Sequence, residues 1–223
     1  MSDLWGFDVA SRTWSPYPDA PGPARGGASL AYANHRLYRF GGFNGEKQLG
    51  GQIDHLDVSA VVERSGKPDV PVGTQTGSWE TTAAPDEIAR SVAGLHFITT
   101  GQGRNYLLLL LGEKNASANG HEGAGQFWDD VWSFQIQPES TTAASLKDAA
   151  QRLVGAKTGE GSWAKVEIPE SSKAVGQLAW PSARGWFASA QGGDIGRDSV
   201  IIWGGLTSDN ERAGDGWMLT VDS

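Results

Sequence analysis

The chain has 223 residues with a formal net charge of −8, and 39% of its residues are hydrophobic, which allows one large all-β domain or two small ones. The acidic balance argues against a nucleic-acid partner or an anionic membrane surface, because both require clustered Lys and Arg. Cysteine is absent from the sequence, so disulfides, thiolate zinc sites, iron–sulfur clusters and cysteine nucleophiles are excluded.

Residues 1–18 are predicted to form half of a four-stranded unit. Asp3 and Trp5 lie at the start of one short strand, and Trp14 opens the next. The first residues lack the basic and apolar pattern of a signal peptide. The longest apolar run, residues 106–111, is too short to cross a bilayer. We therefore expect a soluble, cytoplasmic protein.

Residues 25–82 are predicted to form the first complete unit of four strands. The unit begins with a strand of small apolar residues, a tight turn at Asn34 and His35, and a second strand that ends at a pair of glycines. Asn and Gly both tolerate the left-handed backbone that tight hairpins need. This segment therefore reads as a β-hairpin that the following units should repeat.

Residues 90–168 are predicted to form the second complete unit, with a helical insertion near residues 142–154. One face of this helix is apolar at helical spacing and is formed by Leu146, Ala149, Ala150 and Leu153. The spacing suggests a loop insertion packed on the outside of the sheets. Residues 184–223 are predicted to form a final unit of three strands.

The units share the same landmarks in the same order. An Arg precedes the first strand, at Arg25, Arg90 and Arg184. Glycine closes the second strand, at Gly41, Gly42, Gly112, Gly204 and Gly205. A polar residue and a Trp open the fourth strand, at Trp14, Trp79 and Trp163. Short strands with regular turn signals imply a sandwich, barrel or propeller, and a four-stranded repeat with its own landmarks favours a propeller.

These landmarks resemble the kelch repeat, in which a double glycine ends strand two, an aromatic residue leads into strand three and Trp opens strand four. The glycine pair is complete at Gly41-Gly42 and Gly204-Gly205 and half present at Leu111-Gly112. The 25–82 unit departs from the pattern at Asp54, where Trp is expected. The resemblance covers nearly the whole chain and implies an all-β fold of four-stranded antiparallel kelch propeller blades, with an incomplete ring.

The number of blades is too small for a ring of the usual kelch size. The chain supplies about two complete blades, a half blade and a three-stranded blade, whereas kelch propellers usually close with more blades. Three explanations are open: a truncated product of a longer propeller, one part of a propeller built from more than one chain, or self-association of copies. Open strand edges and an uncovered blade face would invite another chain.

The repeated arginines are candidate partner-binding residues. In ligand-binding kelch domains, arginines at positions similar to Arg25, Arg90 and Arg184 line a pocket for acidic peptides, so the resemblance implies a binding site at the mouth of the ring. Convergent guanidinium groups suit carboxylates. The alternative is architectural, with each Arg joining adjacent blades through hydrogen bonds to loop carbonyls.

His96 is a further candidate binding residue, because it falls in the first strand of its unit, near the inner side of the ring. The alternative for His96 is a histidine with its hydrogen bonds satisfied inside the sheet. A second polar cluster, His121 and Glu122 with Asp129 and Asp130, has spacing that matches no metal-ligand pattern. We expect no metal, no cofactor and no catalytic residue.

The resemblance implies a non-catalytic scaffold for protein–protein interaction, with an unidentified protein partner, and no nucleic-acid or membrane partner is expected. The alternative is a kelch-type enzyme, such as an isomerase or lyase of a small apolar substrate, whose other residues lie on further blades. A third alternative is a fragment without activity of its own. A central cavity lined by aromatic and polar groups would favour the enzyme.

Overall fold

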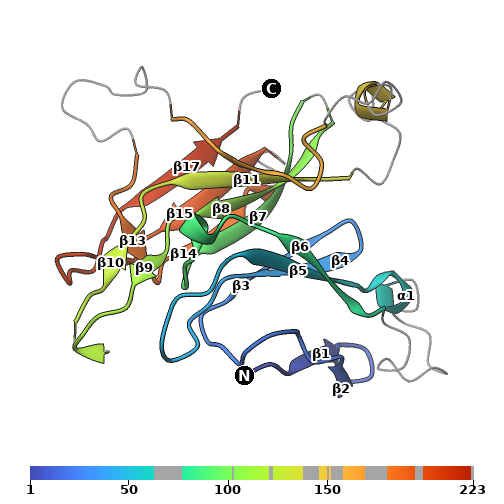
Figure 1. The fold of residues 1–223 in the computed structure, drawn as a ribbon, viewed down its shortest axis with the longest axis horizontal. Coiled ribbons are helices and arrows are strands. Elements are labelled where there is room, and N and C mark those ends of the chain that lie inside the picture. The colour runs from blue at the N-terminus through green and yellow to red at the C-terminus, as the bar shows by residue number, and fades with distance from the viewer. Residues whose placement is uncertain are drawn as a thin grey trace.

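The structure is a computed structural model that describes residues 1–62, 77–101, 103–120, 123–137, 146–149, 151, 158–168, 180–193 and 198–221. Its paired strands are antiparallel and form several separate sheets, so the predicted all-β fold is confirmed (Figure 1). Among these residues, no helix has both the length and the apolar character needed to cross a membrane.

Four main sheets follow one another in chain order, from the hairpin at the bottom of Figure 1 to the sheet at its upper left. The N-terminal hairpin consists of β1 (Leu4–Asp8) and β2 (Thr13–Tyr17). Blade A consists of β3 (Ser29–Ala33), β4 (Arg36–Phe40), β5 (Gln52–Asp57) and β6 (Trp79–Ala83). Blade B consists of β7 (Gly94–Thr99), β8 (Asn105–Leu110), β11 (Val131–Ile136) and β12 (Trp163–Lys165). Blade C consists of β14 (Ala188–Gln191), β15 (Ser199–Trp203) and β17 (Gly216–Thr220). In the described residues these propeller-like blades do not close into a ring.

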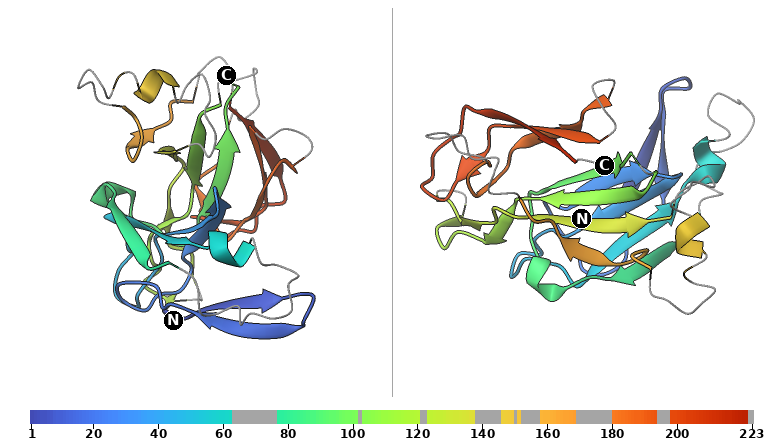
Figure 2. Two further views of the ribbon diagram at one scale, coloured as in Figure 1. Left: turned by 90° about the vertical axis from the view of Figure 1, so that its right-hand side faces the viewer. Right: turned by 90° about the horizontal axis from the view of Figure 1, so that it is seen from above.

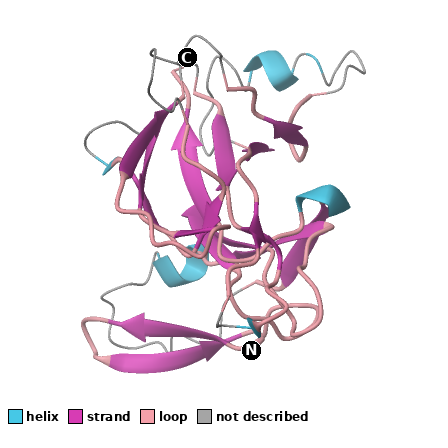
Figure 3. Ribbon diagram, turned by 90° about the vertical axis from the view of Figure 1, so that its left-hand side faces the viewer, coloured by secondary structure: helices cyan, strands magenta, loops and turns pink. Residues whose placement is uncertain are grey.

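The remaining elements are short and lie in the connections. Two small sheets pair β9 (Glu113–Asn115) with β10 (Gln126–Phe127), and β13 (Arg184–Gly185) with β16 (Leu206–Thr207). Short helices in the connections include α1 (Ser59–Val62) and η2 (Asp86–Ile88). Strands and loops make up most of the described chain, and the N-terminal hairpin lies apart from the other sheets (Figure 3).

The hydrophobic core lies between blades. One cluster joins blades A and B and includes Tyr38, Phe40, Ile53, Leu95, Leu107, Leu109 and Phe134. The other joins blades B and C and includes Ile98, Leu108, Leu110, Val131, Val200 and Ile202. Successive side chains of a strand point to opposite faces of its sheet, so β8 serves both clusters. Blade B is covered on both faces, which explains the continuous apolar run in this strand (Figure 2, right).

Backbone hydrogen bonds join neighbouring blades at the glycine pairs. The N–H of Gly42 donates to the carbonyl of Arg90, and the N–H of Gly112 donates to the carbonyl of Arg184, each at 2.9 Å. Both glycines have a left-handed backbone, with φ of 104° and 98°. Leu111 stands where the first glycine of the pair would be and has φ of 53° while fully buried. Burial of this leucine offsets the cost of a backbone that glycine would adopt more easily.

The tryptophans that open fourth strands have different surroundings. The ring centroid of Trp163 lies 5.2 Å from that of Phe40 on blade A and 5.1 Å from that of Phe134 on its own blade. This Trp therefore covers the neighbouring blade, and its apolar body adds to the cluster between blades A and B. Trp79 is half-buried, whereas Trp14 on the N-terminal hairpin is exposed.

The helical insertion contacts blade B through a polar residue. Residues 146–149 and 151 are helical, and the rest of the expected 142–154 helix lies outside the described residues. Leu146 and Ala149 of the apolar face are exposed, whereas Asp148 is buried. The carboxylate of Asp148 accepts hydrogen bonds from Arg104 at 2.9 Å and from Gln135 at 3.1 Å. The ion pair between Arg104 and Asp148 holds the helix against blade B. The helical spacing of the apolar residues therefore did not predict which side of the helix faces the sheet.

Candidate functional site

Three equivalent residues meet at one end of the blades, where the chain enters the first strand of each blade. These mouth residues are Gly27, Val92 and Trp186, each two positions after Arg25, Arg90 or Arg184. The N–H of Val92 donates to the carbonyl of Gly27 at 2.8 Å, and the N–H of Trp186 donates to the carbonyl of Val92 at 3.3 Å. The mouth residues therefore form a hydrogen-bonded series that crosses from blade A to blade C.

All three mouth residues have a left-handed backbone, with φ of 62° at Gly27, 47° at Val92 and 59° at Trp186. This conformation is a genuine outlier for a β-branched residue and costs of order 1–3 kcal/mol. The hydrogen bonds between blades hold Val92 and Trp186 in it. Residues under such strain cluster at binding and catalytic sites, so the mouth is the candidate functional site.

A pocket of about 690 Å³ opens at the mouth. Its lining includes Phe43, Ser91, Val92, Glu113, Trp186 and Arg212, together with residues of the loop between β9 and β10. We call this the mouth pocket. Trp186 presents a half-exposed ring to it. The pocket thus joins residues from all three blades with one loop.

The mouth pocket contains few ionisable groups. Among its described lining residues, Glu113 is the carboxylate and Arg212 the guanidinium, and histidine is absent. Glu113 is largely buried, and its Oε2 accepts a hydrogen bond from Nε2 of Gln48 at 3.0 Å. This arrangement offers an aromatic wall and opposite charges to a ligand.

The predicted candidate residues Arg90 and Arg184 lie buried in their own blades. Nε of Arg90 donates to the carbonyl two residues earlier at 2.9 Å, and Nη1 donates to the carbonyl of Leu111 at 2.8 Å. The guanidinium also binds the carboxylate of Asp130, with Nη1–Oδ1 of 2.7 Å. Arg184 makes the same three kinds of contact, with Asp215 as its acid. The hydrogen bonds that Arg184 donates to the carboxylate of Asp215 lower the pKa of Asp215 to about 2.

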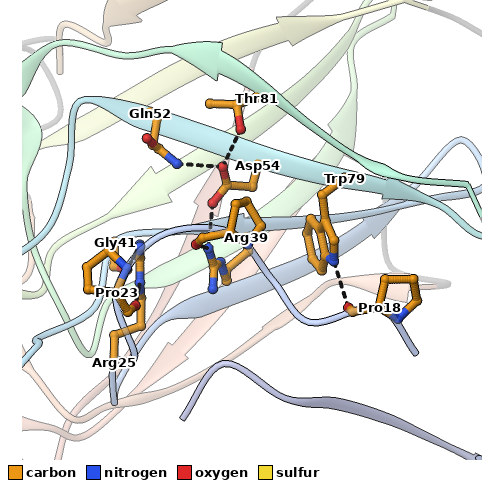
Figure 4. Close-up of polar contacts among 10 residues, drawn as sticks. Pro18, Pro23, Arg25, Arg39, Gly41, Gln52, Asp54, Trp79 and Thr81 are labelled. Carbon is orange, nitrogen blue, oxygen red and sulfur yellow. Dashed lines mark hydrogen bonds and ion pairs between the residues drawn. The ribbon is translucent and has the colours of Figure 1, made fainter. Parts of the chain in front are cut away.

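Arg25 makes the same backbone contacts as the other two arginines, donating to the carbonyls of Pro23 and Gly41 (Figure 4), but it forms no ion pair within the described residues. In the strand register, Gln52 occupies the position that Asp130 and Asp215 hold in the other blades. The acid of blade A lies two residues later, at Asp54, and binds Arg39 with an Nη2–Oδ2 distance of 2.7 Å. The side chains of Gln52 and Thr81 also donate to Asp54, as Figure 4 shows. The departure from the kelch pattern at Asp54 therefore corresponds to a buried ion pair.

His96, the fourth predicted candidate, lies between blades B and C and not in the mouth pocket. Its Nε2 lies 2.7 Å from Oγ of Ser189 on β14. Burial lowers the pKa of His96 from the usual 6.5 to about 4. The imidazole is therefore neutral at pH 7 and forms part of the contact between the two blades.

The low pKa of His96 predicts a loss of stability in mild acid. Between pH 6.5 and about 4 the unfolded state binds a proton that the folded state excludes, so the free energy of unfolding falls as the pH falls through this window. The full loss is about 3 kcal/mol. Urea unfolding at pH 7 and pH 4.5 should show a smaller difference in His96→Gln than in the natural protein. An unchanged difference would contradict the assignment.

His55→Gln is the comparison for this measurement. Burial also lowers the pKa of His55, which acts in the same direction, but Glu80 lies 3.3 Å from its Nε2 and opposes the shift. The substitution should therefore reduce the acid sensitivity less than His96→Gln does.

Metal coordination finds no support in the described part of the chain, where no group of three or more His, Asp or Glu could hold an ion. His121 and Glu122 lie outside the described residues. Asp130 binds Arg90, and the carbonyl of Asp129 accepts a hydrogen bond from Trp180 at 2.6 Å.

The fold is that of an incomplete propeller of antiparallel blades. No protein-family model matches the sequence. The chain is similar to the solved "Structure of YjhT", with a TM-score of 0.60 and 16% sequence identity. The similarity covers 99% of this chain and 50% of that one, so the chain spans half the length of the structure it matches. At this identity the likeness extends to the fold alone.

Sequence reasoning did not find the mouth residues. It selected Arg25, Arg90 and Arg184, whereas the mouth residues come two positions later: Gly27 and Trp186, which are exposed, and Val92, which is half-buried. The constant spacing of two positions after each repeated Arg is the sequence signal that could have identified the mouth residues. The identities Gly, Val and Trp differ so much that only backbone conformation makes them equivalent.

Proposed function

We propose that the chain is a non-catalytic module of the kelch-repeat type that binds a protein partner through the mouth pocket. The observation that carries the proposal is Trp186, which combines a half-exposed ring with a constrained left-handed backbone beside Arg212. Trp and Arg are the residue types that most often dominate protein interfaces. A backbone already constrained by hydrogen bonds has less conformational freedom to lose on binding.

The chemistry of the described lining also supports binding over catalysis. General acid–base catalysis needs a group whose proton can be transferred to or from the substrate, and histidine is absent from this lining. Glu113 is engaged with Gln48. A partner would instead meet an apolar wall, a guanidinium and the backbone of Gly26 and Gly45. A partner segment with an apolar anchor and a carboxylate fits this set of groups.

The second candidate function is a kelch-type enzyme, an isomerase or lyase that acts on a small molecule. The volume of the mouth pocket favours it, because small-molecule sites commonly enclose about 300–1,000 Å³. On this alternative, a small ligand would bind in the pocket and be converted.

Peptide selection tests the proposal. Peptides are selected from a random displayed library against the intact chain, and their affinities are measured by calorimetry. Trp186→Ala should weaken binding at least about tenfold, because truncation of an interface hot spot costs about 2 kcal/mol or more and about 1.4 kcal/mol is tenfold. Trp14→Ala, which removes another exposed Trp far along the chain, is the matched control and should change nothing. The proposal fails if no peptide is selected, or if the peptides bind Trp186→Ala as tightly as the natural protein.

A further inference from the structure

A proline-rich segment, residues 18–23, connects the N-terminal hairpin to blade A and lies against that blade. We call this segment the strap. The carbonyl of Pro18 accepts a hydrogen bond from Nε1 of Trp79 at 2.8 Å (Figure 4). The carbonyl of Pro21 accepts a hydrogen bond from Nη2 of Arg39. Two side chains of blade A thus bind the backbone of two prolines in the strap.

Contacts within blade A hold these two donors in place. Nη2 of Arg39 lies 2.7 Å from Oδ2 of Asp54, and both side chains are almost completely buried. Oδ1 of Asp54 accepts hydrogen bonds from Nε2 of Gln52 at 2.7 Å and from Oγ1 of Thr81 at 2.8 Å. Cζ of Arg39 lies 5.6 Å from the ring centroid of Trp79, within the range of a cation–π contact. The surface that meets the strap is therefore arranged by blade A itself.

The charged pair beneath the strap replaces an apolar pair of the other blades. In each blade the next-to-last residue of the second strand pairs with a residue of the third. These pairs are Arg39 with Asp54 in blade A, Leu109 with Trp132 in blade B, and Ile202 with Trp217 in blade C. A buried ion pair is weak evidence for stability, because apolar residues of similar volume often serve a core equally well. In blade A the pair instead supplies a fixed donor for a carbonyl.

The strap makes few other hydrogen bonds. Its three prolines have no N–H to donate. The N–H of Ala20 donates to the carbonyl of Ser2 at 2.9 Å, and Ala20 is the buried residue of a segment that is exposed at both ends. Nε of Arg39 is buried without a hydrogen-bond acceptor in the described part of the chain. The strap therefore leaves one donor of the surface unused.

This set of groups suits a proline-rich ligand. A proline-rich backbone is extended and makes no internal hydrogen bonds, so its carbonyls are open to donors. Aromatic grooves recognise such segments, commonly those with two residues between a pair of prolines. Pro18 and Pro21 have this spacing. Trp79 supplies an aromatic ring and an N–H, and Arg39 supplies a second donor.

We propose that Trp79 and Arg39 form a binding site for proline-rich segments, and that the strap is its intramolecular ligand, which a partner segment of the same kind displaces. The strap competes strongly because it belongs to the same chain, which corresponds to an effective concentration of about millimolar. A partner segment gains by reaching the unused Nε of Arg39. The proposal is independent of what the mouth pocket binds.

A loosened strap tests the proposal on the full chain. The double variant Pro18→Gly, Pro21→Gly keeps the carbonyls but makes the strap more flexible, so its contact with blade A weakens. A synthetic peptide with the sequence of residues 16–25 should bind this variant at least about tenfold more tightly than it binds the natural protein, as measured by calorimetry. The peptide with the same two substitutions is the control and should bind at least about tenfold more weakly.

Trp79→Phe tests the site itself, because it keeps an aromatic ring and removes the N–H. Introduced into the loosened variant, it should weaken peptide binding about fivefold. Trp14→Phe on the hairpin and Trp186→Ala in the mouth pocket are the controls and should leave the affinity unchanged. Near-ultraviolet circular dichroism should show that each variant stays folded. An affinity that does not change with Trp79→Phe would overturn the site. Equal binding to the natural and loosened proteins, or no binding to the loosened one, would overturn the role of the strap.

Hydrogen exchange supplies a second measurement that needs no peptide. In the otherwise natural chain, Trp79→Phe should accelerate exchange of the Ala20 N–H, because the strap loses a hydrogen bond to blade A. Exchange in β14, β15 and β17, far along the chain, should not change. Unchanged exchange at Ala20 would show that Trp79 does not hold the strap and would overturn the proposal.

Discussion

Arg90→Ala is expected to lower the free energy of unfolding by about 3–5 kcal/mol, because it leaves the carboxylate of Asp130 buried without its counter-charge. The two side chains are 0% and 8% exposed, and they are joined at 2.7 Å and 3.3 Å. The substitution also removes the hydrogen bond to the carbonyl of Leu111 and the contact with the ring of Trp128. Chemical denaturation followed by fluorescence measures the loss.

Arg184→Ala is the matched control for this experiment. Its guanidinium makes equivalent contacts, but the carboxylate of Asp215 is 41% exposed and can be hydrated once the Arg is removed. The loss should therefore be clearly smaller than for Arg90→Ala. Equal losses would show that burial of the acid does not decide the effect. Lost partner binding at unchanged stability would favour a binding role for Arg90 over an architectural one.

The architecture could be predicted from sequence because its signals are local. A glycine pair, or Leu111 with Gly112, marks the end of a strand, and Trp163 opens another, each within a few residues of the feature it predicts. The antiparallel sheets need only such local signals, because each strand pairs with a strand close to it in the chain. The order of the strands in the blades follows from the same reasoning.

Long-range pairing and backbone strain could not be predicted in this way. Arg90 and Asp130 are both recognisable in the sequence, but they are 40 residues apart and nothing local pairs them. The left-handed backbone of Val92 contradicts its intrinsic preference and is imposed by its hydrogen bonds to blades A and C. The candidate site is therefore set by contacts between blades, which local patterns do not record.

Phe40→Ala and Leu110→Ala are expected to destabilise different parts of the molecule. The two residues hold equivalent positions, but Phe40 lies in the cluster between blades A and B and Leu110 in the cluster between blades B and C. Each is almost fully buried, so the expected losses are about 3–5 kcal/mol for Phe40 and about 2–5 kcal/mol for Leu110.

The location of the damage follows from the way blades contact only their neighbours. In such an array the stability of a unit depends mainly on its own interfaces. Hydrogen exchange in Leu110→Ala should therefore accelerate most in β14, β15 and β17, whereas in Phe40→Ala it should accelerate most in β3–β6. Uniform acceleration in both variants would mean that the blades unfold as one cooperative unit. Selective acceleration would show that each blade is held mainly by the apolar face it shares with its neighbour.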